Sequence, residues 1–120
     1  MGSRIAAHFA NAGIPSLLLD ISAELAKKGV ENAARQRPGG FFLDSSASLV
    51  ATGNFENDLP RIGDCDWILE AVVENLEIKR ALFKKVEALR KPDSIVSTNT
   101  SGIPLGRFRK DSPAIFAAIF

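Results

Sequence analysis

Residues 2–20, GSRIAAHFANAGIPSLLLD, decide the fold that we expect for this chain. Small residues recur along one face of a predicted helix, so that face can lie close against a sheet: Gly2, Ala6, Ala10 and Gly13. Gly13 and Pro15 end the helix. The run 16–20, SLLLD, then predicts a strand buried on both faces of a parallel sheet. The stretch therefore indicates an α/β unit with a carboxylate at the carboxyl end of its strand.

The spacing from Gly2 to Asp20 is typical of a dinucleotide site, in which a phosphate-binding turn precedes a ribose-binding acid. Asp20 would accept both ribose hydroxyls and repel the extra phosphate of NADP, which favours NAD. The alternative is that Asp20 only caps a helix beginning near Ser22. A complete site would have a strand and two further glycines ahead of Met1, so we expect the chain to be a fragment of an enzyme. Without that strand, the strands ending at Asp20 and Val72 would lack a shared partner.

The rest of the chain alternates between helix and strand patterns. Further strands are expected at residues 48–52, 66–72 and 94–98. Further helices are expected at about residues 22–37 and after residue 75. The second has an apolar face formed by Ile78, Leu82, Val86 and Leu89, with Phe83 beside them. Lys79 is expected on the polar side of that helix. The alternation predicts one doubly wound parallel α/β sheet in a single domain.

Composition excludes several classes of function. Fifteen basic and 14 acidic residues give a net charge of +1, which offers no electrostatic field for nucleic acid. The sequence has no apolar run of bilayer length, so we expect no membrane partner. The one cysteine, Cys65, cannot form an internal disulfide, which favours a cytoplasmic location. We assign no metal site.

Two polar clusters follow predicted strands. In EAVVENLEIK, residues 70–79, Glu74 and Lys79 lie five positions apart across the start of a helix. Glu74 could instead be a helix N-terminal acid favoured by the dipole, and Lys79 an ordinary solvated lysine. In STNTSG, residues 97–102, four hydroxyls and an amide form a turn that either binds substrate or is an ordinary polar turn. Both clusters are expected at the same sheet edge as Asp20, where open α/β sheets bind ligands.

Three stretches resemble the NAD-binding domain of 3-hydroxyacyl-CoA dehydrogenases and together span nearly all of residues 1–105. They are MGSRIAAHFANAG with LLLD, then ILEAVVENLEIKRALFKKV, and finally IVSTNTSGIPL. The resemblance implies a Rossmann-like fold and a full-length enzyme that oxidises 3-hydroxyacyl-CoA to 3-oxoacyl-CoA in fatty-acid beta-oxidation. The connector at residues 41–74 looks most like the large bacterial enzymes in which this dehydrogenase is fused to an enoyl-CoA hydratase.

The resemblance also implies a role for individual residues. Met1 and Gly2 match the end of the glycine loop beside the NAD pyrophosphate, and Asp20 matches the ribose-binding acid. Lys79 matches a lysine on the cofactor and CoA side of the cleft. Ser101 matches the serine that holds the substrate 3-hydroxyl. Val72, Val73 and Glu74 match the segment that runs along NAD. Asn99 matches the residue that helps to fix the serine turn.

The sequence departs from the family pattern at the catalytic base. Family members remove the hydroxyl proton with a histidine on the strand after the serine turn, whereas the single histidine here, His8, lies in the first helix and matches no catalytic position. We therefore expect the chain alone to be inactive. The full-length enzyme is expected to be a homo-oligomer with an acyl-CoA substrate. A different class, a non-catalytic nucleotide-binding or regulatory module, fits the same residues. Another β-hydroxyacid or sugar-nucleotide dehydrogenase is disfavoured by the turn at residues 99–102 together with EAVVEN.

Overall fold

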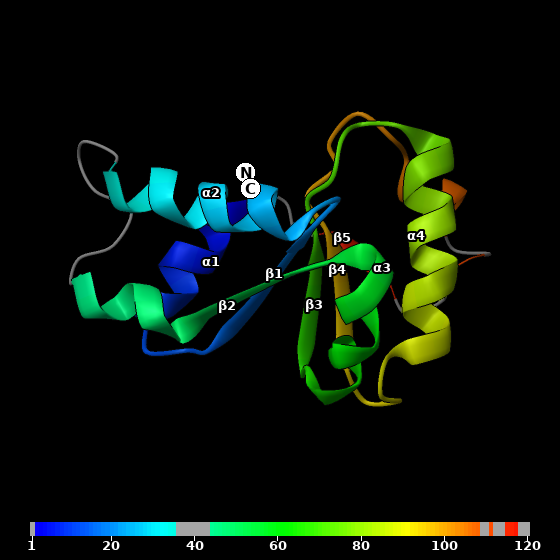
Figure 1. Cartoon of the computed structure of the whole chain (residues 1–120). Coiled ribbons are helices and arrows are strands. Elements are labelled where there is room, and N and C mark those ends of the chain that lie inside the picture. Colours follow the sequence, from blue (N-terminus) through cyan, green and yellow to red (C-terminus); the bar gives the residue numbers. More distant parts are fainter. Residues whose placement is uncertain (1, 36–43, 109–110, 112–114, 118–120) are drawn as a thin grey trace. The chain divides into compact units, whose positions relative to one another are not determined.

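The computed structural model describes residues 2–35, 44–108, 111 and 115–117. The chain divides into two compact units, Met1–Leu59 and Pro60–Phe120 (Figure 1). None of the described helices is both long enough and apolar enough to cross a bilayer.

The first unit packs helices against a two-stranded parallel sheet. Strand β1 (Ser16–Asp20) pairs with β2 (Val50–Asn54), in a register that sets Ser16 beside Val50 and Asp20 beside Asn54. The helices of the unit are α1 (Gly2–Asn11), α2 (Ala23–Arg35) and α3 (Phe55–Asp58), with a short 3₁₀ helix over Asp44–Leu49.

Small residues bring the two long helices of this unit close together. A Cβ atom added at Gly29 of α2 would lie 3.0 Å from the Cβ of Ser3 on α1. The buried core consists of Ala6, Ala10 and Val50, with Leu18, Val30 and Leu49 packed against it. Ala6 and Ala10 of the predicted small-residue face are buried against the sheet as expected, whereas Gly2 is half-buried and Gly13 is exposed beyond the end of α1.

The second unit contains a three-stranded parallel sheet. Its strands are β3 (Trp67–Glu70), β4 (Ile95–Thr98) and β5 (Ile115–Ala117), and β4 lies in the middle. Helix α4 (Leu76–Leu89) connects β3 to β4, and short 3₁₀ helices cover Leu59–Asp64 and Leu105–Arg107. Because β3 and β4 are parallel neighbours, with Glu70 beside Thr98, their carboxyl ends meet at one edge.

The predicted parallel α/β class and the bounds of β1 are confirmed. The described strands form two sheets rather than one, and no described ladder joins β1 to β3, the strands expected to lack a shared partner. All of β1 is half-buried instead of buried on both faces. Strand β2 begins two residues later than predicted, because a 3₁₀ helix extends through Leu49.

The buried face of α4 differs from the prediction. The sequence pattern predicts an apolar face of Ile78, Leu82, Val86 and Leu89, with Phe83 beside them. Val86 and Phe83 are buried as predicted, and the third buried side chain of the helix is Lys79. Ile78 is 50% exposed and Leu89 37% exposed, so the prediction was wrong for both. It was also wrong for Lys79, which is buried because the buried carboxylate of Glu70 lies beside it.

Candidate functional site

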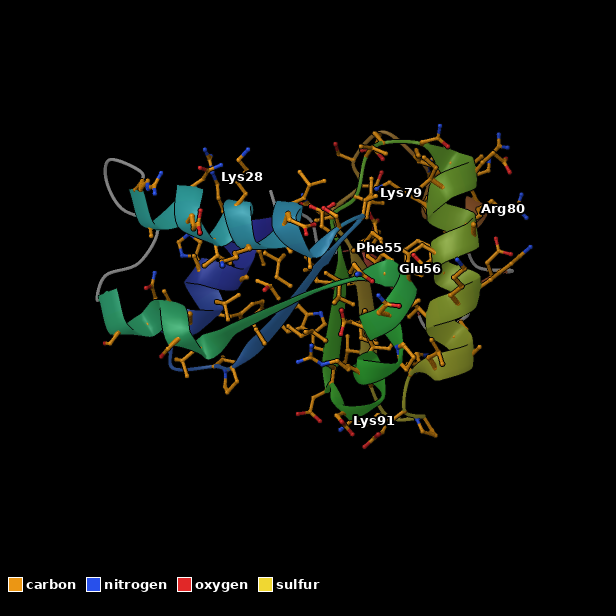
Figure 2. The ribbon with its side chains drawn as sticks, viewed as in Figure 1. Lys28, Phe55, Glu56, Lys79, Arg80 and Lys91 are labelled. Carbon is orange, nitrogen blue, oxygen red and sulfur yellow. The ribbon has the colours of Figure 1, made fainter. Side chains whose placement is uncertain are left out.

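The carboxyl end of β3 carries a buried ion pair. Glu70 is the last residue of β3, and Lys79 lies in the first turns of α4. The Lys79 Nζ donates to both carboxylate oxygens of Glu70, each at 3.0 Å. Both side chains are almost fully buried, at 2% and 3% exposure. Figure 2 shows Lys79 on the side of α4 that faces the sheet, with Arg80 on the opposite side.

Glu74 extends the Glu70–Lys79 pair into a cluster of three charged side chains, and it lies at the end nearest solvent. Its Oε1 is 3.3 Å from the Lys79 Nζ, and it also accepts a hydrogen bond from the Thr100 hydroxyl. Thr100 and, to a smaller extent, Lys79 hold the pKa of the Glu74 carboxyl below its usual value. Half of the side chain remains exposed, at 49%. The cluster therefore presents an ionised carboxylate to solvent at the carboxyl edge of the sheet.

The first turn of α4 contradicts the alternative interpretations of Glu74 as a helix N-terminal acid and of Lys79 as a solvated lysine. The helix begins at Leu76, and its N-cap is Asn75, whose side chain accepts the Ile78 N–H at 3.1 Å. Glu74 therefore precedes the cap, and the acid in the first turn is Glu77. Because Lys79 is buried, the interpretation as a solvated lysine is also wrong.

The hydroxyls at the end of β4 and in the turn that follows it differ in their partners. Ser97 accepts from the Trp67 Nε1 at 2.7 Å, Thr98 donates to Glu70, and Thr100 donates to Glu74. Ser101 is exposed and precedes Gly102, where an added Cβ would be 3.9 Å from the Cγ of Glu74. Ser101, the residue predicted to hold the substrate, is therefore the exposed one among these four hydroxyl residues.

Three more predicted residues lie along this edge. The backbone N–H of Asn99 donates to the Glu70 carbonyl at 2.9 Å, which continues the β3–β4 ladder into the turn. Val72 is half-buried, and its N–H donates to the Glu70 carboxylate at 2.6 Å. Val73 is 65% exposed. The second unit thus brings Val72, Val73, Glu74, Lys79, Asn99 and Ser101 to the ends of two neighbouring strands.

The first unit holds the other predicted residues. Asp20 ends β1 and is half-buried, with its Oδ1 accepting the Ile21 N–H at 2.7 Å. The cap of α2 is Ser22, whose Oγ accepts the Leu25 N–H at 3.2 Å, so Asp20 is not the helix cap. Gly2 is the first residue of α1. Met1 lies outside the described residues.

Sequence reasoning missed Glu70 and Thr98, although both belong to the cluster. Their pairing joins residues 28 positions apart in the sequence. An acid at the end of a strand in an otherwise apolar context was the available signal for Glu70.

Each unit offers, at its strand ends, acceptor and apolar groups of the kinds that bind parts of a nucleotide. Asp20 offers an acceptor for ribose hydroxyls, and the neighbouring Ile21, 78% exposed, offers apolar surface for a flat ring. In the second unit, exposed Val73 provides apolar surface beside ionised Glu74.

Parallel strands with polar groups at their carboxyl ends define the class of nucleotide-binding Rossmann-like domains. Over residues 1–114, the sequence matches the family described as "3-hydroxyacyl-CoA dehydrogenase, NAD binding domain". The chain belongs to this family, and its cofactor is NAD.

Relatives and solved structures agree with this assignment. A Deinococcus radiodurans protein named "Probable 3-hydroxyacyl-CoA dehydrogenase" is 48% identical over 112 residues, which cover 88% of this chain and 32% of the relative. A peroxisomal fatty acid beta-oxidation multifunctional protein of Arabidopsis thaliana is 29% identical over 110 residues, covering 88% of this chain and 15% of that protein. The crystal structure of the dehydrogenase part of multifunctional enzyme 1 from C. elegans superposes with a TM-score of 0.83 at 25% identity, covering all of this chain and 29% of that one. The chain thus spans a third or less of the length of these proteins.

Proposed function

We propose that this chain is the NAD-binding part of an oxidoreductase that converts 3-hydroxyacyl-CoA to 3-oxoacyl-CoA in fatty-acid beta-oxidation. The observation that carries the proposal is the Glu74 carboxylate, held by Lys79 and Thr100 at the strand edge where Ser101 is exposed. Family membership over residues 1–114 supports the same reaction.

The residues take the roles that the family resemblance implies. Asp20 accepts the ribose hydroxyls, and the resemblance assigns Met1 and Gly2 to the pyrophosphate. Val72, Val73 and Glu74 line the path of the cofactor, and Lys79 acts on that side by holding Glu74. Ser101 holds the substrate hydroxyl, and Asn99 fixes its turn through the bond from its N–H to Glu70.

The oxidation removes a hydride from C3 of the substrate and a proton from its hydroxyl group. NAD, when bound, accepts the hydride that leaves C3 of the substrate with its electron pair. Ser101 orients the hydroxyl, whose proton must pass to a base as the C3–O bond becomes a carbonyl. His8, the one histidine of the sequence, is exposed on α1 of the first unit, and we do not assign it this role. We therefore expect no turnover from the 120 residues alone, since acid–base catalysis supplies roughly 10²–10⁴-fold in rate.

Titration with NAD and NADP, followed by NMR chemical shifts, tests the cofactor role. We expect weak binding of NAD and weaker binding of NADP, because the Asp20 carboxylate repels the extra phosphate. Equal affinity for the two nucleotides, or no NAD-dependent shifts, would contradict the assignment. Rapid NADH formation from a 3-hydroxyacyl-CoA would contradict the expected inactivity. Tight NAD binding without turnover would favour a non-catalytic nucleotide-binding module.

We also propose that the protein acts in the cytoplasm. Cys65 is a free, half-buried thiol whose pKa is raised by burial and by neighbouring Asp64 and Asp66, so little reactive thiolate is present. This thiol suits a reducing cytoplasm. We also propose that the full-length enzyme acts on acyl-CoA as a homo-oligomer.

A further inference from the structure

Glu70 is a buried acidic residue at the carboxyl end of β3. Its side chain is 3% exposed, and an isolated buried carboxylate is strongly unfavourable. Both oxygens are therefore fully used. Oε1 accepts from Lys79 and from the Val72 N–H at 2.6 Å, and Oε2 accepts from Lys79 and from the Thr98 hydroxyl.

The partners of Glu70 come from three different segments. Val72 belongs to the loop after β3, Lys79 to α4, and Thr98 to the end of β4. One carboxylate thus fixes the spacing between the loop that carries Glu74 and the turn that carries Ser101.

Both groups that hold Glu74 depend on Glu70. The Lys79 Nζ lies 3.0 Å from Glu70 and 3.3 Å from Glu74, so it bridges the two carboxylates. Thr98, which donates to Glu70, accepts the Thr100 N–H at 3.2 Å, and the Thr100 hydroxyl donates to Glu74. A shift of Glu70 would therefore reach Glu74 by two routes.

Stability alone does not account for this arrangement. Replacing a buried ion pair by apolar residues of similar volume is often neutral or stabilising. A leucine at position 70 would fill similar space but would hold neither Lys79 nor Thr98. The charge at this position contributes to geometry.

We propose that Glu70 is a positioning residue for the cofactor side of the site, holding Glu74 in place through Lys79 and through the Thr98–Thr100 turn. The inference rests on the proposed function for the role of Glu74, but the positioning itself can be measured without a ligand.

The first test replaces Glu70→Asp in the 120-residue chain and titrates carboxyl groups by NMR. The charge is kept but the side chain is shorter, so Lys79 is drawn away from Glu74 and Thr98 is released. We expect the pKa of Glu74 to rise toward that of an ordinary glutamate. Glu77→Asp, the same change at an exposed position of α4, is the matched control and should leave the pKa of Glu74 unchanged.

The carboxyl group of Asp111 serves as an internal reference in the same spectra. It pairs with Arg80 and Lys84 in the same unit and lies outside the Glu70 cluster. General loosening of the unit would raise the pKa values of both Asp111 and Glu74, and that result would overturn the proposal. An unchanged Glu74 pKa in folded Glu70→Asp would overturn it as well.

A second pair of variants decides the matter if Glu70→Asp does not fold. Thr98→Val keeps the volume of a fully buried side chain but removes the hydroxyl, whereas Thr98→Ser keeps the hydroxyl. We expect the Glu74 pKa to rise in the valine variant and to stay low in the serine variant. Equal pKa values in these two variants would refute the route through Thr98.

NAD titration of the same proteins separates this inference from the proposed function. We expect Glu70→Asp to bind NAD about tenfold more weakly than the unaltered chain, and Glu77→Asp to bind equally well. If the unaltered chain shows no NAD binding, the proposed function fails for this chain, while the Glu74 pKa still decides whether Glu70 positions that carboxylate.

Discussion

Lys79 is buried in the structure, although the sequence pattern predicts it on the solvent-exposed side of its helix. Its side chain is 2% exposed, and its ammonium group is bonded to both Glu70 oxygens. Breaking a buried ion pair leaves the other charge uncompensated, which costs about 3–5 kcal/mol. We therefore expect Lys79→Met to lower the free energy of unfolding by about that amount, measured by urea denaturation with Trp67 fluorescence.

Two further variants show whether the uncompensated charge is the cause. The double variant Glu70→Leu/Lys79→Met removes both charges of this pair and should recover most of the lost stability. Lys85→Met alters an exposed lysine of the same helix and should change stability by less than about 0.5 kcal/mol. A Lys79→Met protein as stable as the Lys85→Met protein would contradict the buried pair.

Asp111 makes the second unit sensitive to acid. Its buried carboxylate accepts from the Arg80 Nε at 2.7 Å, and this hydrogen bond lowers the pKa of Asp111 from the ordinary value of 3.8. A lowered carboxyl pKa contributes stability that is complete above the unfolded-state value and lost as pH falls through the folded-state value. We expect melting temperatures to fall as pH drops below about 4 and the Asp111→Asn variant to lose part of that dependence. Parallel pH profiles for the two proteins would contradict this role.

At the scale of elements, the aromatic pair formed by Phe83 and Phe108 fixes α4 to the segment after the last 3₁₀ helix. Their ring centroids are 5.2 Å apart with a 59° tilt, and the side chains are 1% and 0% exposed. Removing a buried phenylalanine ring costs about 3–5 kcal/mol. We expect that loss for Phe83→Ala in chemical denaturation and a clearly smaller one for Leu89→Ala, since Leu89 is 37% exposed. Equal losses would restore the apolar face that the sequence pattern predicted.

The elements also show what sequence patterns can predict here. Strand β1 and helix α1 follow from a continuous apolar run and from small residues at helical spacing, both of which are local signals. The buried face of α4 does not, because pattern reading places a lysine in solvent. Lys79 is buried only because the Glu70 carboxylate, nine residues earlier, lies beside it in the fold.

The candidate site divides in the same way. The sequence pattern indicates Glu74 and the polar turn as a whole, whereas the choice of Ser101 within that turn came from the family resemblance. Which hydroxyl remains exposed was not predictable, since Thr98 and Thr100 bond to acids 28 and 26 positions away. Partners so distant in sequence are defined only by the parallel pairing of β3 with β4.

At the scale of the whole molecule, each unit carries one carboxylate to which the family resemblance assigns a separate role toward the cofactor. Asp20 belongs to the first unit and is assigned the adenosine ribose, and Glu74 belongs to the second unit and is assigned the path of the remaining dinucleotide. AMP contains only the adenosine end, so the two ligands distinguish the two assignments.

We expect Asp20→Asn to weaken the binding of both AMP and NAD, because it weakens charge-assisted hydrogen bonds worth about 1.5–3 kcal/mol each. Glu74→Gln should weaken the binding of NAD and leave AMP affinity unchanged, since AMP does not extend beyond the adenosine end. NMR titration of each variant with both ligands measures this, and Glu77→Gln is the control at an exposed acid. Loss of AMP binding in Glu74→Gln, or unaltered NAD binding in that variant, would contradict the role assigned to Glu74.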